Sequence, residues 1–548
     1  MRLNGSEILA RALKQQGVDT FFFIMGAPMM AVETAAMRLG LRGIDVRHEQ
    51  AGVIAAHAYA RLRNRPGVCM AASGPGVTNL VTGVAHAWAD GVPVLALGGA
   101  APTATTGRGV FQEIDQLAMM LPCTKWATRA HHPQRIPELV NVAIRTAMCG
   151  KPGPVYLDLP GDILYQEVEE SAIEWPAPWD PVQEPRPAAN DAQLASVVGL
   201  LAASRQPVLI AGSGVMWSDG TDALRAFVEA SGIPFYTTPQ ARGVIPEDHP
   251  YCYLNARSTA FRDADAILVV GTRLNYVIGH AAPPRFNAAA KLVRIDVDPA
   301  EIANSPRLDI GIVGDARTVL TQLTTALRPR ISKDSFHAWR ERLRGRNDGK
   351  AAEQERAIAS DATPIHPLRL CKEVRDVLDR DGILCVDGQE ILNFGRQAIP
   401  TYTARHRMNS GVFGTMGVGL PLGLGAKIAS PDKQVIVLHG DGSFGMNAME
   451  FDTAVRHKAG LLVVISNNGG WTADPNHEKP GRDLGFTRYD KLAEALGGYG
   501  EYVEQPEAIR PALLRALEQV GRGVPALVNV RTDPGARAST VAFTNYST

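Results

Sequence analysis

The chain has 548 residues with 56 basic and 56 acidic side chains, so its formal net charge is zero, and neither sign forms a long block. Such a balance argues against nucleic acid and against an anionic membrane surface as a partner. Hydrophobic residues make up 45% of the chain and charged residues 20%, which is usual for a globular protein, and no run approaches the roughly 18 apolar residues of a membrane span.

The cysteines and the first residues bear on the compartment. The six cysteines show neither a CxxC pair nor a Cys/His metal spacing, so reduced thiols in a cytoplasmic enzyme are the simplest interpretation, and none is assigned to catalysis. The segment 1–18 predicts an amphipathic helix with Asn4 and Ser6 as candidate caps, and it lacks the apolar core of a signal peptide. We therefore expect a cytoplasmic protein without a membrane span.

A chain of this length should form about three domains, and residues 1–170 are expected to form the first. Short apolar runs at 21–24, 67–71, 92–97 and 154–159 are separated by lengths that suit helices. Apolar strands that alternate with helices predict a parallel sheet covered on both faces. The segment 171–190 is rich in Pro, Glu and Trp, which predicts an extended linker.

Glu49 lies in the sequence VRHEQAG, where a strand end passes into an apolar helix from Val53 to Leu62. A carboxylate there stands at the mouth of a parallel sheet, where such sheets bind ligands. The local sequence alone leaves open a role as a helix cap or a dipole partner. Further on, a flexible turn at 107–110 leads into Phe111 and Gln112.

Residues 191–330 predict a second α/β domain, with strands at 207–211, 264–270 and 291–297. A glycine turn at 212–214 follows the first of these strands but lacks the full GxGxxG fingerprint of a dinucleotide site. The segment 331–365 is charged and predicts a helical connector with a solvated face. We place the third domain at 366–530, followed by a tail at 531–548.

Two apolar runs in the third domain, 435–438 and 461–465, lead into small or amide residues. Each predicts a buried parallel strand whose C-terminal end opens into a loop. Asp441, Asn468 and Gly470 offer carboxylate, amide and carbonyl oxygens, which are ligands that Mg²⁺ prefers. Gly442 and Ser443 leave backbone N–H groups free at a helix start, which favours a phosphate. The two loops therefore predict a clamp for a metal and a diphosphate.

Residues 443–466 separate the Gly-Asp-Gly sequence from the Asn-Asn pair. This spacing resembles the metal and diphosphate motif of thiamine diphosphate (ThDP) enzymes, and the resemblance covers nearly the whole chain. It implies an α/β fold of three doubly wound parallel-sheet domains: pyrimidine-binding, middle and diphosphate-binding. It also implies that Mg²⁺ is held by Asp441, Asn468 and the Gly470 carbonyl. The implied cofactor contacts are Gly388, Gln389, Gly414, Met416, Gly440, Gly442, Ser443, Trp471 and Thr472.

Within that set, Gly414 would offer a carbonyl to the aminopyrimidine and Met416 would bend the cofactor, although a Met among glycines is usually a core residue. The sequence RHEQAG resembles the segment that carries the glutamate of ThDP enzymes. Glu49 would hydrogen-bond to the pyrimidine nitrogen and favour the imino tautomer, which takes the proton from thiazolium C2.

The sequence FQE at 111–113 is similar to a loop of acetolactate synthases and 2-hydroxyacyl-CoA lyases that lies over the thiazolium from the partner side. Phe111 and Gln112 would then face the substrate, with ordinary loop packing as the alternative. In the family the cofactor sits between the first domain of one subunit and the third domain of another. A homodimer is therefore the minimum, and a tetramer is expected.

The segments 271–276 and 283–286 resemble those of oxalyl-CoA decarboxylase and 2-hydroxyacyl-CoA lyase, whose middle domain can hold an adenine nucleotide. Arg273, Asp296 and Asp315 would bind its phosphate, ribose or base, with surface salt bridges as the alternative. ADP is accordingly a candidate effector.

The last part of the chain bears on the substrate. The chain lacks the GMV and QWQ run that acetolactate synthases carry after the Asn-Asn pair, and Thr472 stands where oxalyl-CoA decarboxylase has a tyrosine. Acyl-CoA-using relatives fold a C-terminal tail over the site, although a frayed end is the alternative. The tail residues considered for this are Ser539, Thr540, Phe543, Asn545 and Tyr546.

We therefore expect a ThDP- and Mg²⁺-dependent 2-hydroxyacyl-CoA lyase that splits an acyl-CoA thioester into formyl-CoA and an aldehyde or ketone, or joins the two. Oxalyl-CoA decarboxylase and an acetolactate-synthase-like carboligase are the enzymatic alternatives. A noncatalytic protein that only senses nucleotide is an alternative of another class, and the retained Glu49, Asp441 and Asn468 argue against it.

Overall fold

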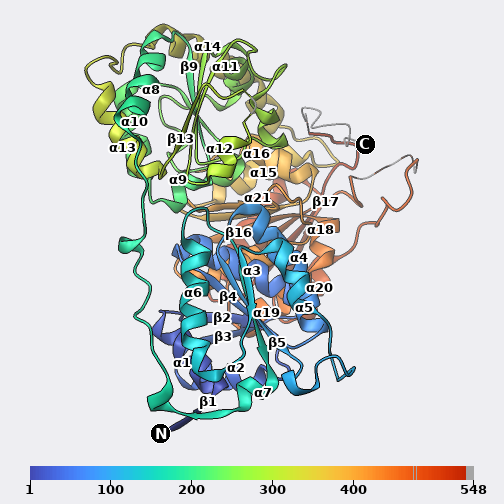
Figure 1. The fold of residues 1–548 in the computed structure, drawn as a ribbon. Helices are drawn as coiled ribbons and strands as arrows, with labels where there is room; N and C mark the ends of the chain where they lie inside the picture. The colour runs from blue at the N-terminus through green and yellow to red at the C-terminus, as the bar shows by residue number, and fades with distance from the viewer. Residues whose placement is uncertain (306, 473, 475, 477, 539–548) are drawn as a thin grey trace.

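The computed structural model describes residues 1–305, 307–472, 474, 476 and 478–538. Within them the chain builds three parallel β-sheets with helices packed on their faces (Figure 1). The expected α/β fold of three doubly wound parallel-sheet domains is confirmed. The tail residues from Ser539 to Tyr546, which were considered as a closing segment, lie outside the described residues.

The first sheet has the strand order β3-β2-β4-β5-β7-β6, and its neighbouring strands are parallel. A short antiparallel pair, β1 (Arg2–Asn4) and β8 (Glu167–Glu169), joins the two ends of this domain. The strands are β2 (Thr20–Phe23), β3 (Arg42–Asp45), β4 (Gly67–Ala71), β5 (Val94–Ala100), β6 (Trp126–Arg129) and β7 (Val155–Pro160). The helices are α1 (Gly5–Gln15), α2 (Met30–Arg38), α3 (Glu49–Arg63), α4 (Pro75–Asp90), α5 (Gln116–Met120), α6 (Ile136–Met148) and α7 (Gly161–Tyr165).

Side-chain caps fix where two of these helices begin. Asn4 caps α1 as predicted, because its side chain accepts from the Glu7 N–H at 3.0 Å while the Glu7 carboxylate accepts from the Asn4 N–H. Ser6 lies inside the helix instead, and its hydroxyl donates to the Leu164 carbonyl at 3.1 Å. At α3 the cap is His48, whose ring accepts from the Gln50 N–H. The Glu49 carboxylate is therefore left for another partner.

The middle sheet has the order β10-β9-β11-β12-β13, again parallel, and its own apolar core. The linker after β8 runs along the outside of the molecule to reach it (Figure 1). The strands are β9 (Pro207–Ala211), β10 (Phe235–Thr237), β11 (Ala266–Val270), β12 (Lys291–Asp296) and β13 (Ile310–Val313). The helices are α8 (Asp191–Ala203), α9 (Ser213–Trp217), α10 (Thr221–Ser231), α11 (Arg257–Asp263), α12 (Pro299–Ala303), α13 (Ala316–Leu327) and the charged connector α14 (His337–Ile358).

The third sheet has the order β15-β14-β16-β17-β19-β18 and is also parallel. The strands are β14 (Ile383–Asp387), β15 (Arg407–Asn409), β16 (Val435–Gly440), β17 (Leu462–Asn467), β18 (Tyr499–Val503) and β19 (Ala526–Arg531). The helices are α15 (Pro367–Val377), α16 (Glu390–Ala398), α17 (Gly419–Ala429), α18 (Asp441–Met446), α19 (Glu450–Arg456), α20 (Tyr489–Ala495) and α21 (Ile509–Gly521).

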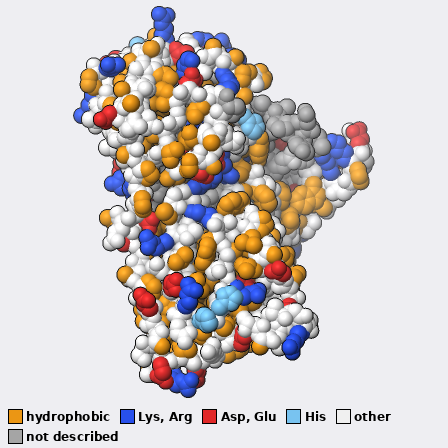
Figure 2. Space-filling model, in the orientation of Figure 1, with side chains coloured by type: hydrophobic (Ala, Val, Ile, Leu, Met, Phe, Trp, Pro, Cys, Tyr) orange, Lys and Arg blue, Asp and Glu red, His pale blue; other side chains and the backbone are white. Residues whose placement is uncertain are grey.

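The first and third domains share a core within one chain. A single apolar cluster contains side chains of α3 and α4 together with side chains of α17, β14, β16 and β17. On the face drawn in Figure 2, basic and acidic side chains are intermixed, in keeping with the net charge of zero. Across the described ranges, no helix is long and apolar enough to cross a membrane.

Candidate active site

The strands β16 and β17 lie side by side in the third sheet, with Gly440 opposite Ser466 at their C-terminal ends. Helix α18 begins at Asp441 directly after β16, and Asn468 directly follows β17. Because the two strands are parallel, the loops that follow them open at the same edge of the sheet. The predicted metal residues are brought together there.

Three oxygen-bearing groups converge at this edge. One atom of the Asn468 amide lies 3.1 Å from Asp441 Oδ1 and 2.9 Å from the Gly470 carbonyl oxygen. With the amide oxygen at this position, three acceptors face one another; with the amide turned, its NH₂ group donates to the other two. Octahedral Mg²⁺ with bonds of about 2.1 Å holds neighbouring ligand oxygens about 3.0 Å apart. The spacing of the three groups fits that ion.

The Asp441 carboxylate is itself incompletely satisfied. Its Oδ2 is buried and has no hydrogen-bond partner among the described residues. Burial raises the pKa of the Asp441 carboxyl to about 7, against the opposing effect of backbone N–H groups such as that of Gly442. A nearby cation would satisfy the unpartnered oxygen and favour the charged carboxylate. The donor set therefore fits a divalent cation that takes oxygen ligands.

A cavity of about 240 Å³ opens beside these oxygens. The Trp471 indole forms part of its wall and lies on Gly442, where a Cβ atom would come within 2.8 Å of the ring. Thr472 Oγ1 donates to Gln389 Oε1 at 3.2 Å and so links two of the lining loops. The predicted cofactor residues that line this cavity are Gly388, Gln389, Met416, Gly440, Gly442, Ser443, Trp471 and Thr472.

A buried histidine that the sequence analysis missed supports this loop. His439 Nε2 accepts from the Leu420 N–H at 2.8 Å, so its proton is assigned to Nδ1, which faces Ser443 Oγ at 3.0 Å. The Ser443 hydroxyl donates in turn to the Gly440 carbonyl at 3.0 Å. Burial lowers the pKa of His439 to about 3, so the ring is neutral at pH 7. The Ser443 hydroxyl is thus engaged inside the protein, which leaves the backbone at the start of α18 to face a ligand.

Arg482 is a second residue that sequence reasoning did not find. It lines the same cavity, and its Nη1 donates to the Thr472 carbonyl at 3.4 Å. The Trp471 N–H donates to the Arg482 carbonyl at 2.8 Å, and Gly470 pairs with Asp483, so the chain returns to the strand end after a long loop. No local pattern links Arg482 to the Asn-Asn pair. It nevertheless places a cation beside the candidate metal site.

The side chains of Glu49, the first residue of α3, and of Gln112 both reach the start of α4 in the first domain. Glu49 Oε2 accepts from Asn79 Nδ2 at 2.9 Å, and Ser73 Oγ donates to Gln112 Oε1 at 3.1 Å. Gln112 has a φ of 58°, in the left-handed region that non-glycine residues rarely adopt. The structure therefore brings the predicted glutamate and the predicted loop glutamine to one helix end, with Asn79 as a partner that the sequence analysis missed.

The first-domain residues are separate from the metal site. Phe111 extends from the same loop as Gln112 and is 84% exposed. In the described part of the chain, neither Glu49 nor Phe111 nor Gln112 lines the 240 Å³ cavity beside Asp441. The predicted catalytic and metal residues therefore occupy two different places in a single chain.

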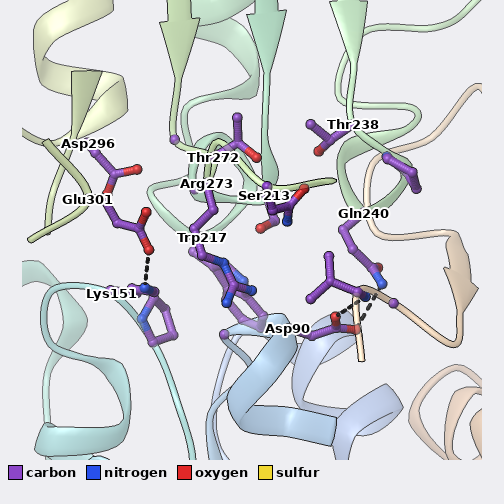
Figure 3. A pocket seen from close by; sticks show the side chains of 18 of the residues that line it. Asp90, Lys151, Ser213, Trp217, Thr238, Gln240, Thr272, Arg273, Asp296 and Glu301 are labelled. Carbon is purple, nitrogen blue, oxygen red and sulfur yellow. Dashed lines mark hydrogen bonds and ion pairs between the residues drawn. The ribbon is translucent and has the colours of Figure 1, made fainter. Parts of the chain in front are cut away.

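A larger cavity of about 780 Å³ lies between the three domains (Figure 3). All three predicted nucleotide residues line it, and each already has a partner within the protein. Arg273 donates to the Ala89 carbonyl, and Asp315 caps α13 and pairs with Arg186 at 3.3 Å. Burial raises the pKa of Asp296 to about 6. The Asp298 N–H donates to Asp296 Oδ1 at 3.1 Å, which partly opposes the effect of burial.

The two cavities meet at the loops that carry predicted cofactor contacts. Gly388, Gln389 and Met416 line both cavities, and Gly414 lines the larger one. Arg396, which the sequence did not point to, also lines the larger cavity, and its Nε has no hydrogen-bond partner in the described ranges. Burial lowers the pKa of Arg396 to about 10, and the group still carries its charge at pH 7. The cavity wall thus offers a cation to an anionic ligand.

Comparison with known proteins gives relatives that match nearly the whole chain. Family models described as the N-terminal TPP binding domain, the central domain and the C-terminal TPP binding domain of thiamine pyrophosphate enzymes match residues 3–119, 194–323 and 392–530. A 2-hydroxyacyl-CoA lyase of Arabidopsis thaliana is 33% identical over 98% of this chain and 96% of its own length. The acetolactate synthase large subunit IlvG of Mycobacterium tuberculosis is 33% identical over 97% and 96%, and oxalyl-CoA decarboxylase of Escherichia coli is 31% identical over 97% and 95%.

Proposed function

The chain belongs to the thiamine pyrophosphate enzyme family and acts on carbon–carbon bonds, and from that premise we propose that it is a ThDP- and Mg²⁺-dependent 2-hydroxyacyl-CoA lyase. It would break the C1–C2 bond of a 2-hydroxyacyl-CoA, giving formyl-CoA and an aldehyde or ketone, or form that bond in reverse. One observation carries the proposal: the small cavity beside the three converging oxygens meets the 780 Å³ cavity. A thioester needs room for a reacting end and for a nucleotide end.

Mg²⁺ would be held by Asp441 Oδ1, Asn468 Oδ1 and the Gly470 carbonyl, whose spacing suits an octahedral ion. The cofactor diphosphate would lie against Gly388 and Gln389 and against the loop of Gly440, Gly442 and Ser443. The Gly414 carbonyl would accept from the aminopyrimidine, and Met416, Trp471 and Thr472 would pack beside the rings. When bound, thiamine diphosphate supplies a nucleophilic carbon and accepts the electron pair of the broken carbon–carbon bond.

Glu49 would hydrogen-bond to the pyrimidine nitrogen and control the proton there. Asn79 occupies one carboxylate oxygen, Oε2, and its donated hydrogen bond fixes the orientation of the other. Gln112 and Phe111 would border the substrate, with Gln112 held by Ser73. In this arrangement the chain would position a proton acceptor beside the cofactor.

We further propose that the working enzyme is at least a homodimer, and a tetramer in solution. Support comes from the lining of the 240 Å³ cavity, which includes Asp441 but not Glu49 of the same chain, so a cofactor bound there would meet Glu49 of a second copy. Phe111, Phe413 and Met446 are more than half exposed and would be covered by the second copy. A fully active monomer in light scattering would contradict this assembly.

The 780 Å³ cavity would take an adenine nucleotide, with Asp296 and Asp315 near the ribose or base and Arg273 near phosphate, so ADP is the proposed effector. Arg396, which lines the same cavity, would attract the phosphates of coenzyme A. A cytoplasmic location is proposed from the six free cysteines.

Arg482 favours a second candidate, oxalyl-CoA decarboxylase. The free carboxylate of an oxalyl group would pair with a cation, and Arg482 supplies one in the small cavity. The first choice remains the lyase because Thr472 and Gln389 present neutral polar groups to a carbonyl compound.

Turnover of three substrates separates the candidates. The enzyme with ThDP and Mg²⁺ is incubated with a 2-hydroxyacyl-CoA, with oxalyl-CoA and with pyruvate. Release of an aldehyde or ketone with formyl-CoA supports the lyase, whereas CO₂ from oxalyl-CoA alone supports the decarboxylase. Acetolactate as the only product would overturn the assignment of a thioester substrate. Nucleotide binding without turnover of any substrate would support the alternative of a noncatalytic nucleotide sensor.

A further inference from the structure

A buried polar junction lies at the inner wall of the 780 Å³ cavity, where the three domains meet. Asp90 ends α4 of the first domain, and Gln240 belongs to a short 3₁₀ helix (Pro239–Ala241) of the middle domain. Figure 3 shows the two side chains facing each other. Arg61 of α3 donates to Gln240, and the Val412 N–H of the third domain donates to Asp90.

The hydrogen bonds of this junction form a directed chain. Arg61 Nη1 donates to Gln240 Oε1 at 3.1 Å, and Gln240 Nε2 donates to Asp90 Oδ2 at 2.8 Å. The other Asp90 oxygen, Oδ1, accepts from the Val412 N–H at 3.3 Å. Arg61, Gln240 and Asp90 are 1%, 8% and 6% exposed, so one amide joins a buried cation to a buried anion. Both Asp90 oxygens accept a hydrogen bond. Removal of either donor would leave a buried acceptor unsatisfied, which costs free energy.

The backbone that follows β15 is pressed against the Asp90 carboxylate. Gly411 has a φ of +61°, and a Cβ atom there would lie 2.1 Å from Asp90 Oδ1, so only glycine fits. The Val412 carbonyl accepts from the Tyr276 hydroxyl of the middle domain at 3.0 Å. The segment 409–412 is therefore held by the first and middle domains, and it leads directly to Gly414 and Met416.

We infer that Asp90 and Gln240 are positioning residues that set the place of segment 409–416 and thereby the cofactor contacts of Gly414 and Met416. The role of Asp90 and Gln240 rests on the proposed function only in that ThDP is taken as the ligand of segment 409–416. A contact that only holds the domains together would make the same hydrogen bonds. Its loss would lower the stability of the fold without a selective effect on cofactor binding.

The polarity of the Asp90–Gln240 pair allows a swap experiment. Asp90→Asn puts an NH₂ group opposite the Gln240 NH₂ or the Val412 N–H, and Gln240→Glu puts a carboxylate opposite Asp90 while keeping an acceptor for Arg61. Each single variant should weaken ThDP binding by roughly 10- to 100-fold, the usual worth of a buried hydrogen bond to a charged group. In Asp90→Asn/Gln240→Glu, the Asn amide can donate to the Glu carboxylate, so most of the affinity should return.

The holoenzyme variants are compared by ThDP titration at fixed Mg²⁺ and by amide hydrogen exchange of peptides from 409–418. The matched control is Gln322→Glu, since Gln322 is also in the middle domain but bonds to Ala189 instead. Faster exchange and weaker ThDP binding in both singles, with recovery in the double, support positioning. If one single variant does not fold, the other and the double carry the same comparison.

Unchanged ThDP affinity and unchanged exchange in folded single variants, or a double variant no better than the singles, would overturn the inference. A wild-type protein that does not bind ThDP would contradict the proposed function instead. In that case the exchange of 409–418 still decides whether Asp90 and Gln240 position the segment.

Discussion

Replacement of Glu49 by Gln is the sharpest test of the first-domain half of the site. The substitution keeps the size of the side chain and one acceptor for Asn79, but the new NH₂ group cannot stabilise a proton on the pyrimidine nitrogen. A positioned acid–base group contributes about 10²- to 10⁴-fold, so hydrogen–deuterium exchange at thiazolium C2 should slow by about that factor. ThDP affinity should change by less than about tenfold, because one hydrogen bond of the cofactor is altered.

Replacement of Asn79 gives a second variant with which the loss of C2 exchange in Glu49→Gln can be compared. Asn79→Leu removes the 2.9 Å hydrogen bond that orients Glu49 but leaves the carboxylate in place. Hydrogen bonds to charged groups are worth about 1.5–3 kcal/mol, so exchange at C2 should slow by roughly 10- to 150-fold, less than in Glu49→Gln. Asn141→Leu is the control, since Asn141 bonds to Ala177 on the surface. Exchange at C2 at the wild-type rate in Glu49→Gln would refute the role of Glu49. A larger loss of C2 exchange in Asn79→Leu than in Glu49→Gln would refute the idea that Asn79 only orients Glu49.

Three further predictions follow from the other cavity residues. Asp441→Asn should weaken Mg²⁺-dependent ThDP binding by more than about 100-fold, beyond the 10- to 100-fold typical of residues that only support a metal ligand. The measurement is a fluorescence titration with Asp533→Asn, in the same cavity, as the control. Equal ThDP affinities of the two variants would argue against the metal assignment. Arg482→Gln should reduce turnover of oxalyl-CoA more than that of a 2-hydroxyacyl-CoA, by about tenfold or more; an equal effect on both would mean that Arg482 serves the cofactor. Burial raises the pKa of Asp296 to about 6 from an unfolded value near 3.8, so its ionisation destabilises the fold as pH rises through this window. Asp296→Asn should therefore stabilise the protein by about 3 kcal/mol near pH 7 and hardly at all below about pH 4, and calorimetry that shows a loss of stability near pH 7 would contradict the cost assigned to this carboxylate.

The sequence predicted the architecture well because apolar strands carry a local signal. The run 435–438 and the run 461–465 became the neighbouring parallel strands β16 and β17, since near-continuous aliphatic residues suit a sheet covered on both faces. The convergence of Asp441, Asn468 and Gly470 followed from that pairing, because both loops leave the same edge. The cap of α1 at Asn4 was predictable for a similar reason, as the capping box is a pattern of four residues.

What the sequence did not predict depends on contacts between distant segments. Asn79 reaches Glu49 from the next helix, and Arg482 reaches the small cavity only after a long loop turns back. Asp90 and Gln240 belong to different domains, and no spacing in the sequence relates them. Ser6 is not the cap because the helix begins at Gly5, with Asn4 as its cap, and the Leu164 carbonyl accepts a hydrogen bond from the Ser6 hydroxyl instead. Such residues become visible only when the domains are packed together.

Cleavage of 2-hydroxyacyl thioesters by the enzyme is best tested by kcat/KM for two substrates measured side by side. Because both candidate reactions release formyl-CoA, the carbonyl compound from a 2-hydroxyacyl-CoA and the CO₂ from oxalyl-CoA are the products to quantify. We expect ThDP- and Mg²⁺-dependent release of the aldehyde or ketone with the higher kcat/KM. Higher kcat/KM for CO₂ release, with no carbonyl compound formed, would contradict it.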